Sequence, residues 1–136
     1  MLSAGSTGYA FNRTRQTFLA TGLSIARTHW SRFRGLMGVS AADFPAGRGL
    51  WIVPSRGVHA FGMRFAIDVV YLDRDQTVVL ALEGLRPWRI APVRMRAASV
   101  LELPGHTLQA TKTSIGDEIE ISTTQRAEAG STWPTS

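Results

Sequence analysis

A chain of 136 residues, 44% of them hydrophobic and 18% charged, can bury one core, and this composition excludes a wholly disordered protein. The chain has no cysteine, which excludes a disulfide scaffold, a thiol nucleophile and a cysteine-ligated metal centre. No apolar run approaches the roughly 20 residues of a membrane-spanning helix. The net charge is +5, and all but one of the 15 basic residues are arginines.

The arginines are scattered along the chain, so there is no basic arm or tail. We interpret most of this charge as solvated surface and do not expect nucleic acid to be the partner. The exception is segment 84–98, which surrounds Trp88 and contains no acidic residue. Its cationic residues are Arg86, Arg89, Arg94 and Arg96. Because guanidinium groups suit phosphate or carboxylate, we expect Arg86, Arg94 and Arg96 to form an anion patch.

The first expected element is a strand over 17–26, where small or polar and apolar residues alternate. The same stretch follows two arginines and contains Ser24-x-Ala26, so a signal peptide ending near Ala26 is the alternative. The apolar stretch is weak for a signal peptide because Thr17, Thr21, Gly22 and Ser24 dilute it. We therefore expect a cytoplasmic protein, with export as the alternative.

Residues 28–39 predict a helix, because aromatic and aliphatic residues recur at helical spacing and Gly38 can end it. Period-two patterns and turn residues predict further strands at 50–53, 58–65, 67–73, 77–82, 97–103 and 118–122. Residues 73–76 predict a hairpin turn and 107–112 a short helical turn.

About seven short strands with one or two helices indicate a mainly β domain of the α+β class, built as a small closed or half-closed β-barrel. We expect this single domain over residues 12–122, between a flexible N-terminus (1–11) and a flexible tail (123–136). Residues 99–121 are similar to the crossover unit of cradle-loop barrels, which is an analogy of fold only.

No standard catalytic motif is present, and the three histidines are isolated in sequence, so no catalytic residue, cofactor or metal is assigned. Segment 58–73 is the most informative, because Arg64 and Asp68 would share one face of a continuous strand among small residues. A structural ion pair or turn-capping aspartate is the alternative for these two residues. The candidate ligand-binding residues, expected at one barrel rim, are His59, Arg64, Asp68, Trp88 and Arg89.

Three sequence blocks, taken together, are specific. They read SRFRGLMG at 31–38, VHAFGMRFAIDVVYLD at 58–73, and VLELPG at 100–105 with Ile115-Gly116-Asp117. In this order they resemble the family called domain of unknown function 192. The resemblance covers about residues 12–122 and implies a compact β-rich fold, without an established activity. Ser55 stands where related sequences often have cysteine, and Ala66 where proline is usual, so thiol chemistry does not transfer to this chain.

Three functions follow from these patterns. The favoured one is a non-enzymatic binding or accessory module, a monomer or weak oligomer, that holds a small anionic ligand or peptide at the barrel rim. The second is an enzyme in which His59 and Asp68 form an acid–base pair and Arg64 or Arg89 binds an anionic substrate. The third is a weak nucleic-acid binder that uses segment 86–96.

Overall fold

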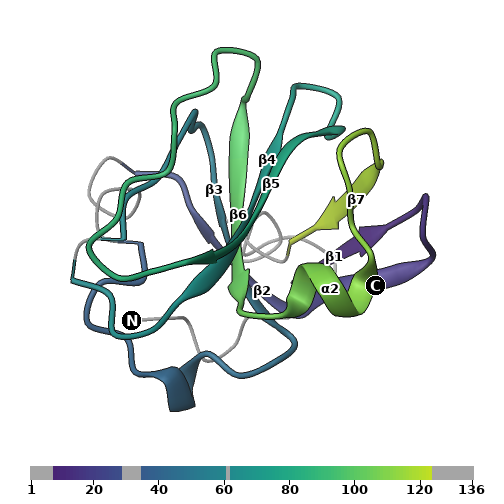
Figure 1. The fold of residues 1–136 in the computed structure, drawn as a ribbon. Coiled ribbons are helices and arrows are strands. Elements are labelled where there is room, and N and C mark those ends of the chain that lie inside the picture. Colours follow the sequence, from purple (N-terminus) through teal and green to yellow (C-terminus); the bar gives the residue numbers. More distant parts are fainter. Residues whose placement is uncertain (1–7, 29–34, 61, 124–136) are drawn as a thin grey trace, which may run out of the picture.

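The computed structural model describes residues 8–28, 35–60 and 62–123, which form a curled seven-stranded sheet (Figure 1). The strands are β1 (Gly8–Asn12), β2 (Thr17–Ala26), β3 (Arg48–Ile52), β4 (Ile67–Leu72), β5 (Val78–Leu85), β6 (Ser99–Pro104) and β7 (Ile119–Ser122). A 3-10 turn, η1 (Ala41–Asp43), and a short helix, α2 (Thr107–Thr111), accompany them. The expected mainly β fold is confirmed.

The sheet has the order β5-β4-β6-β3-β2-β1-β7, and its two edge strands meet at one end. Neighbouring strands are antiparallel except β2 and β3, which run parallel. Val78 N donates to Asp117 O (2.9 Å) and Gly116 N donates to Val78 O (2.8 Å). Thr77 and Glu118 form a further bridge across this seam. The sheet is therefore a half-barrel: among the described residues, its edges are joined where β5 begins and β7 begins, at residues 76–78 and 116–119.

Two hydrophobic clusters lie on the two faces of the sheet. The inner cluster takes residues from six strands and from α2, and includes Leu23, Leu72, Leu103 and Leu108. The outer cluster packs one face of β3, β4 and β6 against irregular segments of the chain. Both faces of β4 are buried, and its even-numbered and odd-numbered side chains serve different clusters.

The structure confirms most of the predicted strands, including the strand at 17–26, which forms β2. The strand predicted at 58–65 is wrong, because its described residues form turns and a single bridge between His59 and Ile90. Gly62, with a φ of +74°, turns the chain there. Strand β1 was not predicted, and it begins inside the segment expected to be flexible. The helix predicted at 28–39 falls mainly on residues 29–34, outside the described residues, and residues 35–38 form turns.

Candidate functional site

A cavity of about 210 Å³ lies on the outer face of the sheet and has a glutamate among its lining residues. Its walls come from β3, from the irregular segments 35–37 and 54–59, and from Met63, and they are mostly apolar. The polar side chains that line it are Ser55, His59 and Glu102. We call this space the Glu102 cavity.

Glu102 is fixed in the middle of the sheet. It lies on β6, in register with Leu50 of β3 and Val69 of β4, whose side chains belong to the outer cluster. The residue is only 2% exposed, and its Oε1 atom has no hydrogen-bond partner among the described residues. Burial raises the pKa of Glu102 to about 8. A carboxyl group in this environment can hold a proton near neutral pH and can pair with a group that enters the cavity.

The wall that carries His59 is held by backbone hydrogen bonds rather than by a strand. Ala60 N donates to Arg89 O, and Trp88 N donates to Ala60 O, both at 2.7 Å. These bonds flank the His59–Ile90 bridge and attach the wall to segment 86–91. The wall therefore keeps a defined position although it is irregular.

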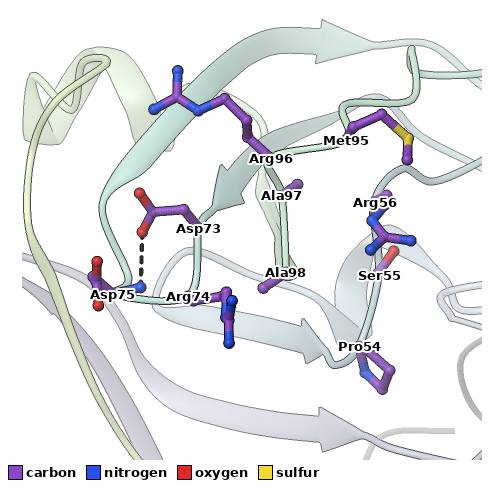
Figure 2. Close-up of a pocket in the computed structure, with 10 residues that line it drawn as sticks. All are labelled: Pro54, Ser55, Arg56, Asp73, Arg74, Asp75, Met95, Arg96, Ala97 and Ala98. Atoms are coloured by element: carbon purple, nitrogen blue, oxygen red, sulfur yellow. Dashed lines mark hydrogen bonds between the residues drawn. The ribbon is translucent and has the colours of Figure 1, made fainter.

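A second, wider cleft of about 890 Å³ lies next to the Glu102 cavity, at the rim of the half-barrel (Figure 2). Its lining comes from three segments: 54–56 after β3, the β4–β5 turn at 73–75, and 95–98 before β6. Ser55 N donates to Ala98 O (2.9 Å), and Ala98 N donates to Leu72 O (2.7 Å), so 95–98 lies between the other two. We call this space the rim cleft.

The rim cleft is lined by three exposed arginines, Arg56, Arg74 and Arg96. None of them forms an ion pair with another residue in the described part of the chain. Asp73 and Asp75 also line the cleft, and one oxygen of Asp73 accepts hydrogen bonds from Asp75 N and Thr77 N (both 2.9 Å) within the turn. The formal charge of the lining is therefore positive.

Pro54 and Ser55 line both the Glu102 cavity and the rim cleft. The Ser55 hydroxyl donates to Gly57 O (2.7 Å) and so holds the short segment between the two spaces. The two spaces therefore share one wall. Among the described residues, no group of three or more His, Asp or Glu side chains is arranged to hold a metal ion.

The structure does not gather the five predicted ligand-binding residues into one of these spaces. His59 lines the Glu102 cavity, whereas Arg64, Asp68, Trp88 and Arg89 line neither space. Arg64 and Arg89 are exposed, and Trp88 is 68% exposed. Of the predicted anion patch, Arg96 lines the rim cleft, and Arg86 and Arg94 are exposed elsewhere.

His59 and Asp68 do not form the acid–base pair that one hypothesis required. The Asp68 carboxylate accepts hydrogen bonds from Gly84 N (3.0 Å) and Leu108 N (2.9 Å) and so joins β4 to β5 and α2. This is the inner side of β4, whereas the Glu102 cavity lies on the outer side. Each oxygen of the Asp68 carboxylate therefore has a backbone partner within the fold, and Asp68 forms no ion pair with another described residue.

Sequence reasoning missed Glu102, although a signal was present. Glu102 lies between Leu101 and Leu103 in a short apolar strand, at a position that shares a face with Val100. A charged residue on a strand buried on both faces indicates either a partner or a site. Of the rim-cleft arginines, Arg96 was predicted as part of the anion patch, whereas Arg56 and Arg74 were missed because they lie on two other segments of the chain.

Comparison with known proteins agrees with the fold. The family model for DUF192, described as uncharacterised, matches residues 10–121. This chain belongs to the DUF192 family. A UPF0127 protein of Thermococcus sibiricus is 32% identical over 114 residues, which is 80% of this chain and 71% of that protein. A UPF0127 protein of Pyrococcus abyssi is 40% identical over 63 residues, covering 46% of the DUF192 chain and 53% of the relative.

Two solved structures share the fold of this DUF192 protein. A protein of unknown function from Novosphingobium aromaticivorans superposes with a TM-score of 0.71 and 17% identity, covering 83% of this chain and 82% of the other. A candidate transcription regulator from Sinorhizobium meliloti superposes with a TM-score of 0.73 and 21% identity, covering 89% of this chain and 97% of the other. At these identities the likeness concerns the fold alone. No helix in the described part of the DUF192 protein is long and apolar enough to cross a membrane.

Proposed function

We propose that this DUF192 protein is a non-enzymatic binding module for a small anionic ligand, and that the rim cleft holds the anion. The observation that supports this proposal is the lining of one cleft by Arg56, Arg74 and Arg96, which form no ion pair with another described residue. Arginine stays charged at physiological pH, and its planar group matches carboxylate and phosphate oxygens. The site differs from the one expected at segment 84–98, because only Arg96 is common to both.

Charge in the cleft sets the expected strength of binding. The three arginines are exposed, so their attraction for an anion is screened by salt. The two aspartates of the β4–β5 turn reduce the positive potential. Among the described residues, the Asp75 side chain forms no hydrogen bond that holds the turn, whereas the Asp75 backbone N–H does. We therefore expect affinity for a free anion to be modest and to fall as salt rises.

Calorimetric titration with inorganic phosphate and pyrophosphate at low salt tests this proposal. Arg56→Gln and Arg96→Gln should each weaken binding by about tenfold, the loss of one charge-assisted contact. Asp75→Asn should strengthen binding. Arg86→Gln is the matched control, because it makes the same charge change outside the cleft. If Arg86→Gln weakened phosphate binding as much as the cleft variants do, the anion would be attracted by the overall surface charge and not by the cleft. Phosphate affinity that did not change in Arg56→Gln or Arg96→Gln would contradict the proposal in the same way.

An acid–base enzyme is the second candidate, with Glu102 in the role first given to Asp68. The observation in its favour is that Glu102 and His59 line one mostly apolar cavity. Conversion of a bound anionic compound, followed by ³¹P and ¹H NMR and abolished by Glu102→Gln, would favour the enzyme. Stable binding without conversion favours the binding module.

A further inference from the structure

We propose that the Glu102 cavity binds the ammonium group of the same ligand whose anionic group lies in the rim cleft. This inference rests on the proposed function and extends it, because it makes the ligand a small zwitterion rather than a simple anion. It assigns the floor of the cavity, Glu102, as the recognition group for the positive end.

The chemistry of the lining leads to a cation. Glu102 lines the cavity, and its Oε1 atom is buried without a hydrogen-bond partner among the described residues, which is costly unless a donor satisfies it. An ammonium group supplies hydrogen-bond donors and also a positive charge opposite to that of the Glu102 carboxylate. The thioether side chains of Met37 and Met63 and the aliphatic Ile52 would surround the attached carbon chain.

The size of the cavity favours a small organic group. Its volume of about 210 Å³ corresponds to about seven water molecules at liquid density, more than a bare ion fills. A short alkylammonium group and part of its carbon chain fit within this volume. The apolar walls would exclude the ligand's anionic end, which would remain in the more open rim cleft.

The shared wall makes a single ligand feasible. Pro54 and Ser55, drawn in Figure 2 on the side of the rim cleft, line both spaces, so a short carbon chain that passes this segment would have one end in each space. The two ends would then meet opposite charges: the Glu102 carboxylate inside and the arginines outside. Joining two weak contacts in one molecule raises affinity beyond either alone, provided that the chain length matches the span.

Binding of the ammonium group should depend on pH, because Glu102 must release its proton. Burial raises the pKa of Glu102 to about 8, so affinity should rise by about tenfold between pH 7 and pH 9. Alkylammonium probes stay protonated over this range, as lysine does. His59 is the other titratable side chain among the described residues that line the cavity, and His59→Gln tests its share of the effect.

The experiment compares three probes on the full chain by calorimetry: ethylammonium, inorganic phosphate, and a series of aminoalkyl phosphates that begins with 2-aminoethyl phosphate. One member of the series should bind at least tenfold more tightly than phosphate, with an optimum in chain length. Glu102→Gln, which keeps the shape of the side chain, should remove this gain and its pH dependence and leave phosphate binding unchanged. Arg56→Gln should weaken phosphate and leave ethylammonium unchanged.

The two proposals fail in different ways. If Glu102→Gln binds the aminoalkyl phosphates as tightly as the wild type while the arginine variants weaken binding, the ammonium site is wrong and the anion site stands. If the arginine variants bind phosphate as the wild type does, the proposed function is wrong. Thermal unfolding of each variant confirms that the comparison is made on folded protein.

Discussion

At the scale of single residues, Glu102 and Asp68 show how two buried acids can have opposite roles. The Asp68 carboxylate accepts hydrogen bonds from two backbone N–H groups and so connects parts of the fold. Glu102 leaves one oxygen without a described partner and lines a cavity. Burial of an unsatisfied polar group destabilises a fold, typically by about 1–3 kcal/mol. The fold therefore carries a cost at Glu102 that ligand binding can offset.

The raised pKa of Glu102 predicts how stability depends on pH. The folded protein keeps this proton up to about pH 8, whereas the unfolded chain releases it above its ordinary pKa of 4.5. The contribution of Glu102 to the free energy of unfolding is therefore full below pH 4.5, declines as pH rises to about 8, and then levels off. Glu102→Gln should remove this decline and stabilise the protein at pH 9 by about 1–3 kcal/mol.

Urea unfolding of the wild type and Glu102→Gln at pH 5 and pH 9 measures this difference. Glu118→Gln is the control, because Glu118 is exposed and its ion pair with Arg13 (3.3 Å) lies at the surface. Identical pH slopes in all three proteins would contradict the prediction.

Asp68 predicts a change in stability without a change in binding. Asp68→Ala leaves the N–H groups of Gly84 and Leu108 without their acceptor, and we expect a loss of about 3 kcal/mol in the free energy of unfolding. Phosphate affinity, measured by calorimetry well below the melting temperature, should not change. Asp43→Ala, at an exposed position in η1, should stay within about 0.5 kcal/mol of the wild type. A loss of phosphate affinity in folded Asp68→Ala protein would mean that Asp68 takes part in ligand binding.

At the scale of elements, the turn before β7 is held to β1 by one carboxylate oxygen. Oδ2 of Asp117 accepts hydrogen bonds from Asn12 Nδ2 (2.9 Å), Arg15 Nε (3.0 Å) and Ser114 N (3.0 Å). Burial alone would raise the pKa of Asp117, but these donors together hold it below its ordinary value. The network fixes the turn that places β7 beside β1.

This network predicts a loss of stability in acid. The pKa of Asp117 is lower in the folded protein than in the unfolded chain. The contribution of Asp117 to stability is therefore full above its ordinary pKa of 3.8 and is lost as pH falls through its pKa in the folded protein. Asp117→Ala should lower the free energy of unfolding at pH 7 by about 2–3 kcal/mol and show a smaller further loss between pH 5 and pH 2 than the wild type. Chemical denaturation across this pH range measures both effects, and parallel curves for the two proteins would refute the assignment.

At the scale of the whole molecule, the seam between β5 and β7 converts a sheet into a half-barrel. The N–H groups of Val78, Gly116 and Ile119 cross this seam. Their amides should exchange with deuterium as slowly as those of a central strand such as β6, although β5 and β7 are edge strands. Hydrogen exchange followed by NMR provides the measurement. Exchange as fast as at exposed loop positions would mean that the half-barrel opens at the seam.

The sequence predicted the fold class and most strands because alternation and turn residues are local signals. The strand at 17–26 and the hairpin at 73–76 follow directly from such signals. Segment 58–65 misled the prediction: its residues alternate like a strand, but Gly62 takes a positive φ and backbone bonds attach Ala60 to 88–89. The two spaces at the site could not be predicted, because residues such as Arg56, Arg74 and Glu102 meet only through strand order and register.

The position of Glu102 has a consequence for how ligand preference can change. Its strand, β6, lies between β3 and β4 and is buried on both faces, so most substitutions in it should destabilise the fold. Apart from Ile52 of β3, the walls of both spaces come mainly from irregular segments, which generally accept substitutions and insertions. New specificities can therefore be engineered by randomising residues 35–37, 54–58 and 95–96, with the acidic floor unchanged.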